Sequence, residues 1–242
     1  RDRPLSIYNN VYLHKVQDMI PGPQFGRLVF LSGNRVLKIT NPKDFVMPFV
    51  LNISPEGNIL KELCEKLHVN FKDIGIWGSS LLFKQPIRRH EIDVVIYGRE
   101  KCEEAFRILS EKSLCPDDII LDPEEGLCTQ FSYKGIKFDL FYDYGDEEPH
   151  VLDGATIKIK SILTNEFTSI IDSTEGLYYP SVYGTDSNLR LISFRPAHSR
   201  RFFKPGQKLL FKSVSQIEIT HASGKKETAY GVLNYEKAKF IS

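Results

Sequence analysis

The sequence predicts an α+β protein in which a central mixed sheet with covering helices is flanked by a small β-rich N-terminal unit and a β-barrel-like C-terminal domain. Two observations support this fold class. Apolar residues recur at helical and at strand spacing in alternation through the middle of the chain, whereas both ends carry short strand-like runs separated by turn residues. We therefore place three domains at 1–50, 51–150 and 151–242.

The N-terminal unit is predicted from apolar runs such as Leu28–Leu31 and Val36–Ile39. Turn residues at Pro21-Gly22-Pro23 and Gly33-Asn34 separate these runs. The unit carries no motif from which a function can be read.

Two amphipathic helices and three strands are predicted in the middle of the chain. Ser54–Glu56 supplies an N-cap, a proline at the first helical position and an acidic first turn, and apolar residues then recur at i, i+3, i+4 and i+7 as far as Leu67. The same spacing predicts a second helix over 99–112. Strands are expected over 74–77, 91–97 and 136–142.

Beyond residue 150 the pattern is that of strands throughout. They are predicted over 155–162, 178–183, 189–194, 207–211, 216–220 and 228–233, with glycine-containing turns between several of them. Their near-regular spacing predicts a small barrel or sandwich, and an OB-like barrel is compatible with it.

Composition limits the classes of function. The chain has 242 residues, of which 41% are hydrophobic, and 32 basic residues nearly balance 31 acidic ones. A net charge of +1 gives no overall attraction to nucleic acid or to an acidic membrane. No apolar run approaches the roughly 20 residues of a membrane helix, and the first residues lack the apolar stretch of a signal peptide. We expect a cytoplasmic protein with no membrane contact.

The cysteines and histidines carry no metal signature. None of the four cysteines forms a Cys-x-x-Cys pair, and the six histidines do not show the spacing of a zinc site. We expect the cysteines to be small, inert side chains in a reducing compartment.

Acidic residues on two predicted strands are the candidates for metal chemistry. Glu91 and Asp93 are two residues apart on one strand, so their side chains share a face, while Ile92 and Val94 point into the core. Neighbouring carboxylates repel each other and favour a divalent cation between them. Asp139, on the next predicted apolar strand, is a third candidate ligand for Mg²⁺ or Mn²⁺.

A glycine turn before the acidic strand predicts a phosphate cradle. Gly78 allows close approach of the backbone, Ser79 offers a hydroxyl, and the residues after them are expected to open a helix whose amides face an anion. Ser80 is either part of this cradle or a helix cap. The connection to the acidic strand supplies three cations that a loop can bring to a triphosphate: Lys84, Arg88 and Arg89.

This combination resembles the DNA polymerase β-like nucleotidyltransferase superfamily, whose pattern is an apolar strand ending in Gly-Ser or Gly-Gly, a spacer, and two acids separated by one apolar residue. Here the pattern is Ile74–Ser80 followed by Glu91–Ile96. A closer resemblance is to uncharacterised, archaeal-type nucleotidyltransferase-domain proteins. It rests on Tyr97-Gly98-Arg99-Glu100 after the acidic strand and on Tyr179–Tyr183 before the β-rich tail.

The resemblance implies transfer of a nucleoside monophosphate from a triphosphate such as ATP to a hydroxyl group on nucleic acid, protein or a small molecule. It implies that Glu91 and Asp93 bind metal, that Asp139 orients or deprotonates the acceptor, and that Gly78-Ser79 hold the β- and γ-phosphates. Glu91 departs from the aspartate of most members, and its longer side chain would move the metal. Asp143 and Asp146 compete with Asp139 as the third acid.

Basic residues in the tail raise the question of RNA or DNA binding. Arg200, Arg201, Phe202 and Lys204 belong to a run that mixes cations with aromatic rings, as single-strand binding surfaces do, and a solvated edge explains the run equally well. For Lys158 and Lys160, on one strand face, the solvated edge is preferred.

Three hypotheses follow from these residues. The first is a metal-dependent nucleotidyltransferase. The alternative is a catalytically degenerate module that binds nucleotide or nucleic acid, and a weaker third is a toxin-like transferase acting on host RNA. The acceptor, the nucleotide preference and the oligomeric state are left open.

Overall fold

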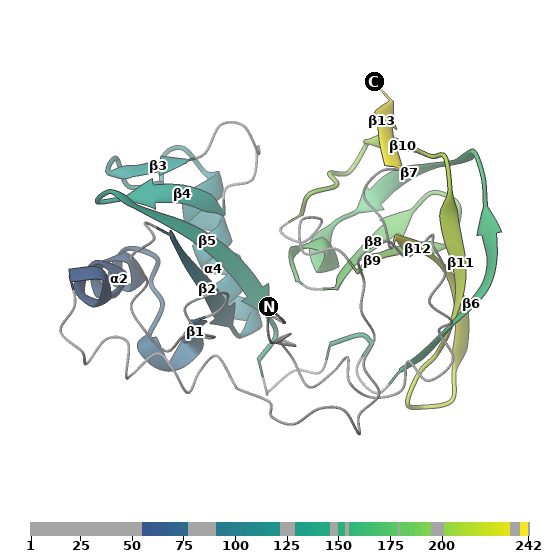
Figure 1. Cartoon of the computed structure of the whole chain (residues 1–242), viewed down its shortest axis with the longest axis horizontal. Coiled ribbons are helices and arrows are strands. Elements are labelled where there is room, and N and C mark those ends of the chain that lie inside the picture. The colour runs from purple at the N-terminus through teal and green to yellow at the C-terminus, as the bar shows by residue number, and fades with distance from the viewer. Residues whose placement is uncertain are drawn as a thin grey trace, which may run out of the picture. The chain divides into compact units, whose positions relative to one another are not determined.

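The computed structural model describes residues 55–76, 91–121, 129–145, 150–152, 155–178, 180–194, 201–232 and 238–241 (Figure 1). These residues form a mixed α and β protein made mostly of strands, and the chain divides into two compact units between residues 149 and 150. The predicted N-terminal unit over 1–50 and the predicted glycine turn at 78–80 lie outside the described residues.

The first unit contains one mixed sheet and two helices among its described residues. Its elements are α2 (Pro55–Lys66), the 3-10 turn η4 (Phe71–Asp73), β1 (Ile74–Ile76), β2 (Glu91–Tyr97), α4 (Arg99–Ser110), β3 (Ile119–Leu121), β4 (Gln130–Tyr133) and β5 (Ile136–Asp143). The five strands lie in the order β1-β2-β5-β4-β3. β2 and β5 are parallel, and the other neighbours are antiparallel.

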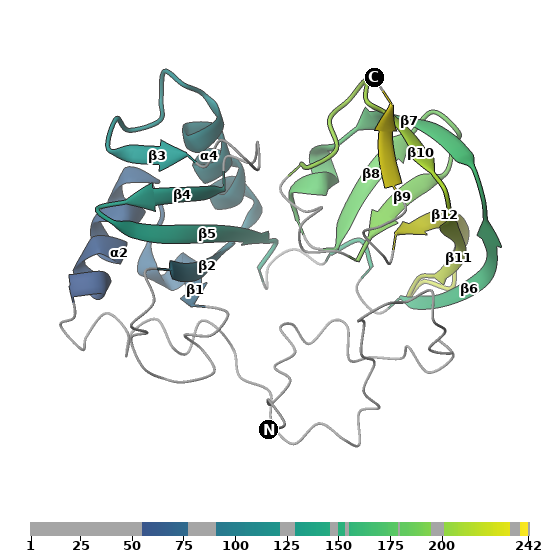
Figure 2. The same cartoon turned by 45° about the horizontal axis from the view of Figure 1, so that its top comes forward.

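Both helices pack against the same face of this sheet. The ring of Phe106 on α4 lies edge-on to Tyr142, with 6.1 Å between ring centroids. On α2, Glu62 accepts a hydrogen bond of 3.2 Å from the hydroxyl of Tyr133. Strand alternation and the β4–β5 register put Tyr133 and Tyr142 on one face, and Figure 2 shows both helices behind the sheet. We call the opposite side of the sheet, which neither of the two described helices covers, the helix-free face.

The second unit contains a single sheet of eight strands among its described residues. They are β6 (Thr156–Leu163), β7 (Glu166–Asp172), β8 (Ser181–Thr185), β9 (Arg190–Ser193), β10 (Lys208–Phe211), β11 (Val214–Thr220), β12 (Lys226–Val232) and β13 (Ala238–Ile241), with the 3-10 turn η5 (Thr174–Leu177) after β7. Their order is β13-β10-β7-β8-β9-β12-β11-β6. Two buried clusters, one around Tyr183, Phe203 and Phe211 and one around Ile192 and Ile217, form its core.

The barrel-like prediction for this unit is not met by the described strands. A barrel closes only when its two outer strands pair with each other. Within the described residues, β13 pairs with β10 and β6 pairs with β11, and no ladder joins β13 to β6. The sheet is therefore open. The strand content predicted beyond residue 150 is confirmed, whereas closure is not observed.

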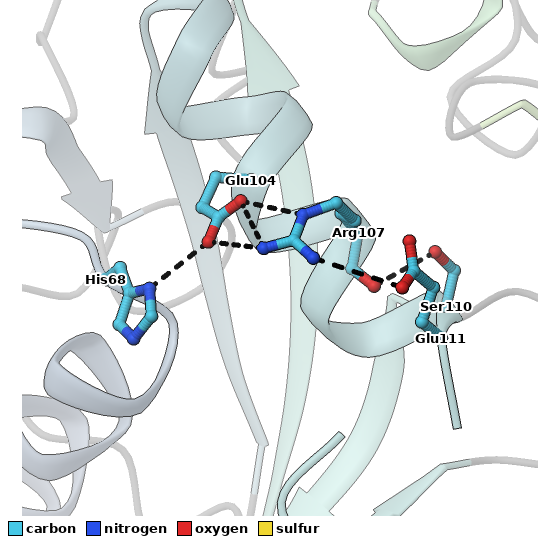
Figure 3. Close-up of polar contacts among 5 residues, drawn as sticks. All are labelled: His68, Glu104, Arg107, Ser110 and Glu111. Carbon is cyan, nitrogen blue, oxygen red and sulfur yellow. Dashed lines mark hydrogen bonds and ion pairs between the residues drawn. The ribbon is translucent and has the colours of Figure 1, made fainter. Parts of the chain in front are cut away.

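A charged network links the segment after α2 to the surface of α4 (Figure 3). The guanidinium of Arg107 donates two hydrogen bonds of 2.9 Å to the carboxylate of Glu104. The same carboxylate lies 3.2 Å from Nδ1 of His68, and the hydrogen bond from Arg107 lowers the pKa of Glu104. All three side chains are at least one-third exposed. The network therefore lies on the surface, where water weakens its ion pairs.

The helices of the described residues are too short or too polar to cross a membrane.

Candidate metal and nucleotide site

β2 carries the two acids that the sequence singled out. Glu91 opens the strand and is exposed, and Asp93, two residues later, is partly buried on the same face. The alternate residues Ile92, Val94 and Ile96 are buried beneath the helices. Alternation along the strand therefore places both acids on the helix-free face, as predicted. The six predicted phosphate-contacting residues between 78 and 89 lie outside the described residues.

The parallel register of β2 and β5 brings the second acid of the pair opposite Asp139. Asp93 is the register partner of Asp139, and Glu91 is the partner of Lys137. Partners on adjacent strands point to the same side of a sheet and are separated by about 4.8 Å in the backbone. Asp93 and Asp139 are therefore neighbouring carboxylates on the helix-free face, while Glu91 has a lysine beside it.

A tight hairpin adds a third polar side chain to this row. Lys134 and Gly135, with φ values of 48° and 79°, form the two-residue turn between β4 and β5. Positive φ at both positions is typical of the hairpin turns that fix strand register. The resulting register puts Gln130 opposite Asp139, and its Nε2 donates a hydrogen bond of 3.1 Å to Oδ2 of Asp139.

The row Asp93–Asp139–Gln130 crosses three strands, and Asp139 at its centre is only 9% exposed. Burial of a carboxylate next to another carboxylate is costly unless a cation or hydrogen bonds compensate it. Gln130 compensates one oxygen of Asp139. Asp93, the register partner of Asp139 on β2, adds a second carboxylate to the same row, and two neighbouring carboxylates favour a divalent cation.

The described residues contain no compact group of three His, Cys, Asp or Glu side chains that would hold a metal ion by itself. Glu91, Asp93 and Asp139 lie on one face but do not converge on one point. Mg²⁺ keeps several of its waters and is usually held by one or two carboxylates together with substrate phosphates. The pair Asp93 and Asp139 fits this mode of binding, which requires a nucleotide to complete the coordination.

Asp143, a competitor for the role of third acid, has a structural task. Its Oδ1 accepts a hydrogen bond of 2.8 Å from the backbone of Gly145, and its register partner is Tyr97 at the end of β2. It therefore caps the turn after β5, four residues along the chain from Asp139. Asp146 lies outside the described residues.

Tyr97-Gly98-Arg99-Glu100 forms the turn from β2 into α4. Gly98 has a φ of 95°, a value that favours glycine, and its N–H donates to the carbonyl of Asp143 at 2.9 Å. The guanidinium of Arg99 lies over the ring of Tyr144, 4.7 Å from its centroid. This segment contacts β2, α4 and the end of β5, so its residues connect the C-terminal ends of two inner strands.

Residues 180–183, the described part of the segment 179–183, belong to the core of the second unit. Ser181 and Tyr183 are fully buried, and the hydroxyl of Tyr183 donates to the carbonyl of Gly176 at 3.3 Å. A Cβ at Gly176 would lie 2.2 Å from the ring of Tyr183, so only glycine leaves room for this tyrosine. Both segments that carry the closer resemblance thus have structural roles.

The basic and aromatic run of the tail is divided between surface and core. Phe203 is buried against Tyr183, with 5.1 Å between ring centroids, and Phe202 packs edge-on to Phe203. Lys204 is exposed and Arg201 is half-buried, while Arg200 lies outside the described residues. The packing of Phe202 and Phe203 accounts for the aromatic half of this run without a nucleic acid.

Lys158 and Lys160 lie exposed on β6, the outer strand of the sheet, and Lys160 pairs with Glu218 at 3.4 Å. The interpretation of these lysines as a solvated strand edge is confirmed.

Two cysteines behave as the sequence predicts. Cys64 and Cys102 are buried free thiols. Burial raises the pKa of Cys64 to about 12, and burial likewise raises the pKa of Cys102, whose Sγ donates to the carbonyl of Ile96 at 3.2 Å. Both thiols are therefore protonated at neutral pH, so neither is an activated nucleophile.

Sequence reasoning missed Gln130 and Lys137, the neighbours of the acids on the helix-free face. The turn pair Lys134-Gly135, between alternating apolar residues on both sides, is the signal that predicts the hairpin and hence Gln130.

In comparisons with known proteins, no family model, no curated protein and no solved structure matches this chain.

Proposed function

We propose that this protein is a metal-dependent nucleotidyltransferase that moves a nucleoside monophosphate from a nucleoside triphosphate to an acceptor hydroxyl. The observation that carries the proposal is the register of β2 with β5, which pairs Asp93 with Asp139 on the helix-free face. The order of the motifs along the chain supports it, because a glycine-serine turn precedes the acidic strand. The acceptor is a nucleic acid, a protein or a small molecule.

In the proposed reaction the acceptor oxygen attacks the α-phosphorus, the bond from that phosphorus to the bridging oxygen of the β-phosphate breaks, and pyrophosphate leaves. Asp93 and Asp139 would hold the divalent cation together with the triphosphate. Mg²⁺ or Mn²⁺, when bound, supplies positive charge to the attacking and leaving oxygens. Asp139, with Oδ2 held by Gln130, would orient the acceptor hydroxyl or take its proton.

Residues outside the described part complete the proposed site. Gly78, Ser79 and Ser80 are assigned to the phosphates, with Lys84, Arg88 and Arg89 as the cations that reach the triphosphate. Glu91 is assigned as an additional metal ligand, and its register neighbour on β5 is Lys137.

The pairing of Glu91 with Lys137 favours a second candidate function, a module that binds nucleotide and metal without turnover. Such a module needs the two facing carboxylates but not a third ligand. It predicts nucleotide binding that depends on Asp93 and no transfer to any acceptor.

Transfer is tested by incubating the protein with Mg²⁺ or Mn²⁺, labelled triphosphates, and pools of RNA, DNA and protein acceptors. We expect labelled product from the wild type and a loss of about 100-fold or more in Asp93→Asn, because this variant removes charge that acts on the transition state. Asp117→Asn, at an exposed position of the same unit, is the matched control and should transfer normally. Equal product from wild type and Asp93→Asn would overturn the transferase proposal.

A further inference from the structure

A shallow cavity of about 530 Å³, largely open to solvent, lies on the surface of the second unit and is lined mostly by polar side chains. It lies between the start of β9, the hairpin that joins β11 to β12, and the segment before β6. Its lining residues are Val151, Arg190, His221, Ser223, Lys225 and Glu227. Figure 1 shows β9, β12 and β11 side by side at this end of the sheet. None of these residues belongs to the proposed transferase site.

The hairpin turn presents three of the lining side chains. The N–H of His221 donates to the carbonyl of Lys225 at 2.9 Å, and the N–H of Gly224 donates to the carbonyl of His221 at 2.8 Å. Gly224 has a φ of 82°, which allows this close reversal of the chain. The turn therefore holds His221, Ser223 and Lys225 along one rim of the cavity.

One carboxylate anchors the other rim. Arg190 pairs with Oε1 of Glu227, and Oε2 of the same carboxylate lies 3.4 Å from Nε2 of His221. Arg190 and Glu227 come from β9 and β12, which are parallel neighbours. Glu227 thus holds the arginine and the histidine in place, and both oxygens of its carboxylate are engaged.

The cavity retains donors that the protein itself does not use. Arg190 contacts Glu227 through Nη2, and among the described residues this is its only ion pair, so the N–H groups on Nε and Nη1 are left for a ligand. Lys225 is exposed and makes no ion pair within the described part of the chain. Arg190 and Lys225 against Glu227 give a net charge of +1 with His221 neutral.

These donors suit a tetrahedral oxyanion better than a carboxylate. The planar fork of an arginine matches two phosphate oxygens, and a lysine and a serine hydroxyl supply donors for the others. A carboxylate has only two oxygens. The volume exceeds that of a bare phosphate and falls within the range of small-molecule sites, which leaves room for an esterified group.

We propose that this cavity binds the phosphate group of a phosphate ester through Arg190, Ser223 and Lys225. Two sources share this chemistry: a free nucleotide and the backbone or end of a nucleic acid strand. The site lies within one unit and contains no residue of the acidic row, so its failure would leave the transferase proposal untouched.

The test is a titration of the full chain, without divalent metal, against inorganic phosphate, a nucleoside monophosphate, and a short single-stranded oligonucleotide with or without a terminal phosphate. Lys225→Gln is the informative variant, and Lys226→Gln is its matched control, because Lys226 carries the same charge and is exposed on the next residue but does not line the cavity. Arg190→Lys keeps the positive charge but removes the planar guanidinium with its paired N–H donors.

We expect saturable binding of at least one of these ligands, with the affinity reduced about tenfold in Lys225→Gln and unchanged in Lys226→Gln. Arg190→Lys should also weaken binding. Preference for the mononucleotide identifies a free ester as the source, and preference for the oligonucleotide identifies a strand. Equal weakening by Lys225→Gln and Lys226→Gln, or no saturable binding of any ligand up to about 10 mM, would overturn the proposal.

Discussion

Asp139 in the five-stranded sheet and His150 at the start of the second unit are buried to nearly the same degree, 9% and 8% exposed, but their surroundings differ. Nδ1 of His150 accepts a hydrogen bond from the N–H of Leu152 at 3.1 Å, and Nε2 lies 3.0 Å from the carbonyl of Pro180. Asp139 receives one amide from Gln130 and faces the carboxylate of Asp93.

The difference teaches how to separate a structural polar group from a functional one. The ring of His150 is satisfied as a neutral imidazole by the backbone of its own unit, so its burial needs no ligand. The Asp93–Asp139 register places two carboxylates side by side, and a cation would relieve the repulsion between them.

The largest expected effect is on the folding of the second unit when His150 is removed. His150→Ala leaves the N–H of Leu152 and the carbonyl of Pro180 without their partner in a buried space. We expect the free energy of unfolding to fall by about 3 kcal/mol in urea titrations. His150→Asn should lose less, because an asparagine oxygen can accept the N–H two residues ahead. A change in His150→Ala no larger than in His150→Asn would contradict this structural role.

An effect of similar size is expected from pH. Burial lowers the pKa of His150 to about 4, from 6.5. Since the folded-state pKa is depressed, the unfolded chain takes up this proton first as the pH falls. The stability contributed by neutral His150 is thus present above pH 6.5 and lost progressively down to about pH 4, by about 3 kcal/mol. Urea unfolding at several pH values checks this, and the His150→Asn variant should lack this part of the pH dependence.

A smaller effect of opposite sign is expected at the acidic row. Asp93→Asn removes one of two facing carboxylates, so without divalent metal it should stabilise the first unit by about 0.5 kcal/mol. Mg²⁺ with nucleotide should stabilise the wild type and not this variant. Asp117→Asn, measured in parallel, should change neither quantity. If Asp93→Asn destabilises the metal-free protein, the pair is held by the fold for structural reasons, and the contrast with His150 fails.

The smallest effect is expected at the surface network of Figure 3. Arg107→Ala removes the guanidinium that donates hydrogen bonds to Glu104, but both side chains are well exposed. Exposed ion pairs contribute little because water and salt screen them. We expect no resolvable shift of the urea midpoint. A shift as large as that of His150→Ala would show that exposed ion pairs stabilise this protein as much as buried hydrogen bonds do.

Long elements with a clear period were predictable from the sequence. Both helices and the strands β2 and β5 are confirmed with bounds close to those expected, because a buried face repeats over seven or more residues in each. β3, β4 and β13 span three or four residues, too few for a period to emerge. β7 is longer, but its apolar residues do not mark its buried face, so the sequence did not predict this strand. Thr168 is buried on a hydrogen bond to Asp186, whereas Phe167 is 56% exposed.

The candidate site could be predicted only in part for a related reason. The shared face of Glu91 and Asp93 follows from strand alternation alone. Which residue stands opposite each acid depends on the register between strands distant in sequence, and no local pattern contains it. The register pairs Asp93 with Asp139 and gives Glu91 the neighbour Lys137. The β4–β5 hairpin places Gln130 opposite Asp139, and the turn pair Lys134-Gly135 is the sequence feature that indicates this hairpin.

Electron paramagnetic resonance of Mn²⁺ in the presence of a non-hydrolysable triphosphate tests the central claim most directly, because it reports metal bound at the acidic row without requiring an acceptor. We predict that the wild type and Asp117→Asn withdraw Mn²⁺ from solution beyond what the nucleotide alone binds, and that Asp93→Asn and Asp139→Asn do not. Equal Mn²⁺ binding by all four proteins, or none by the wild type, would contradict it.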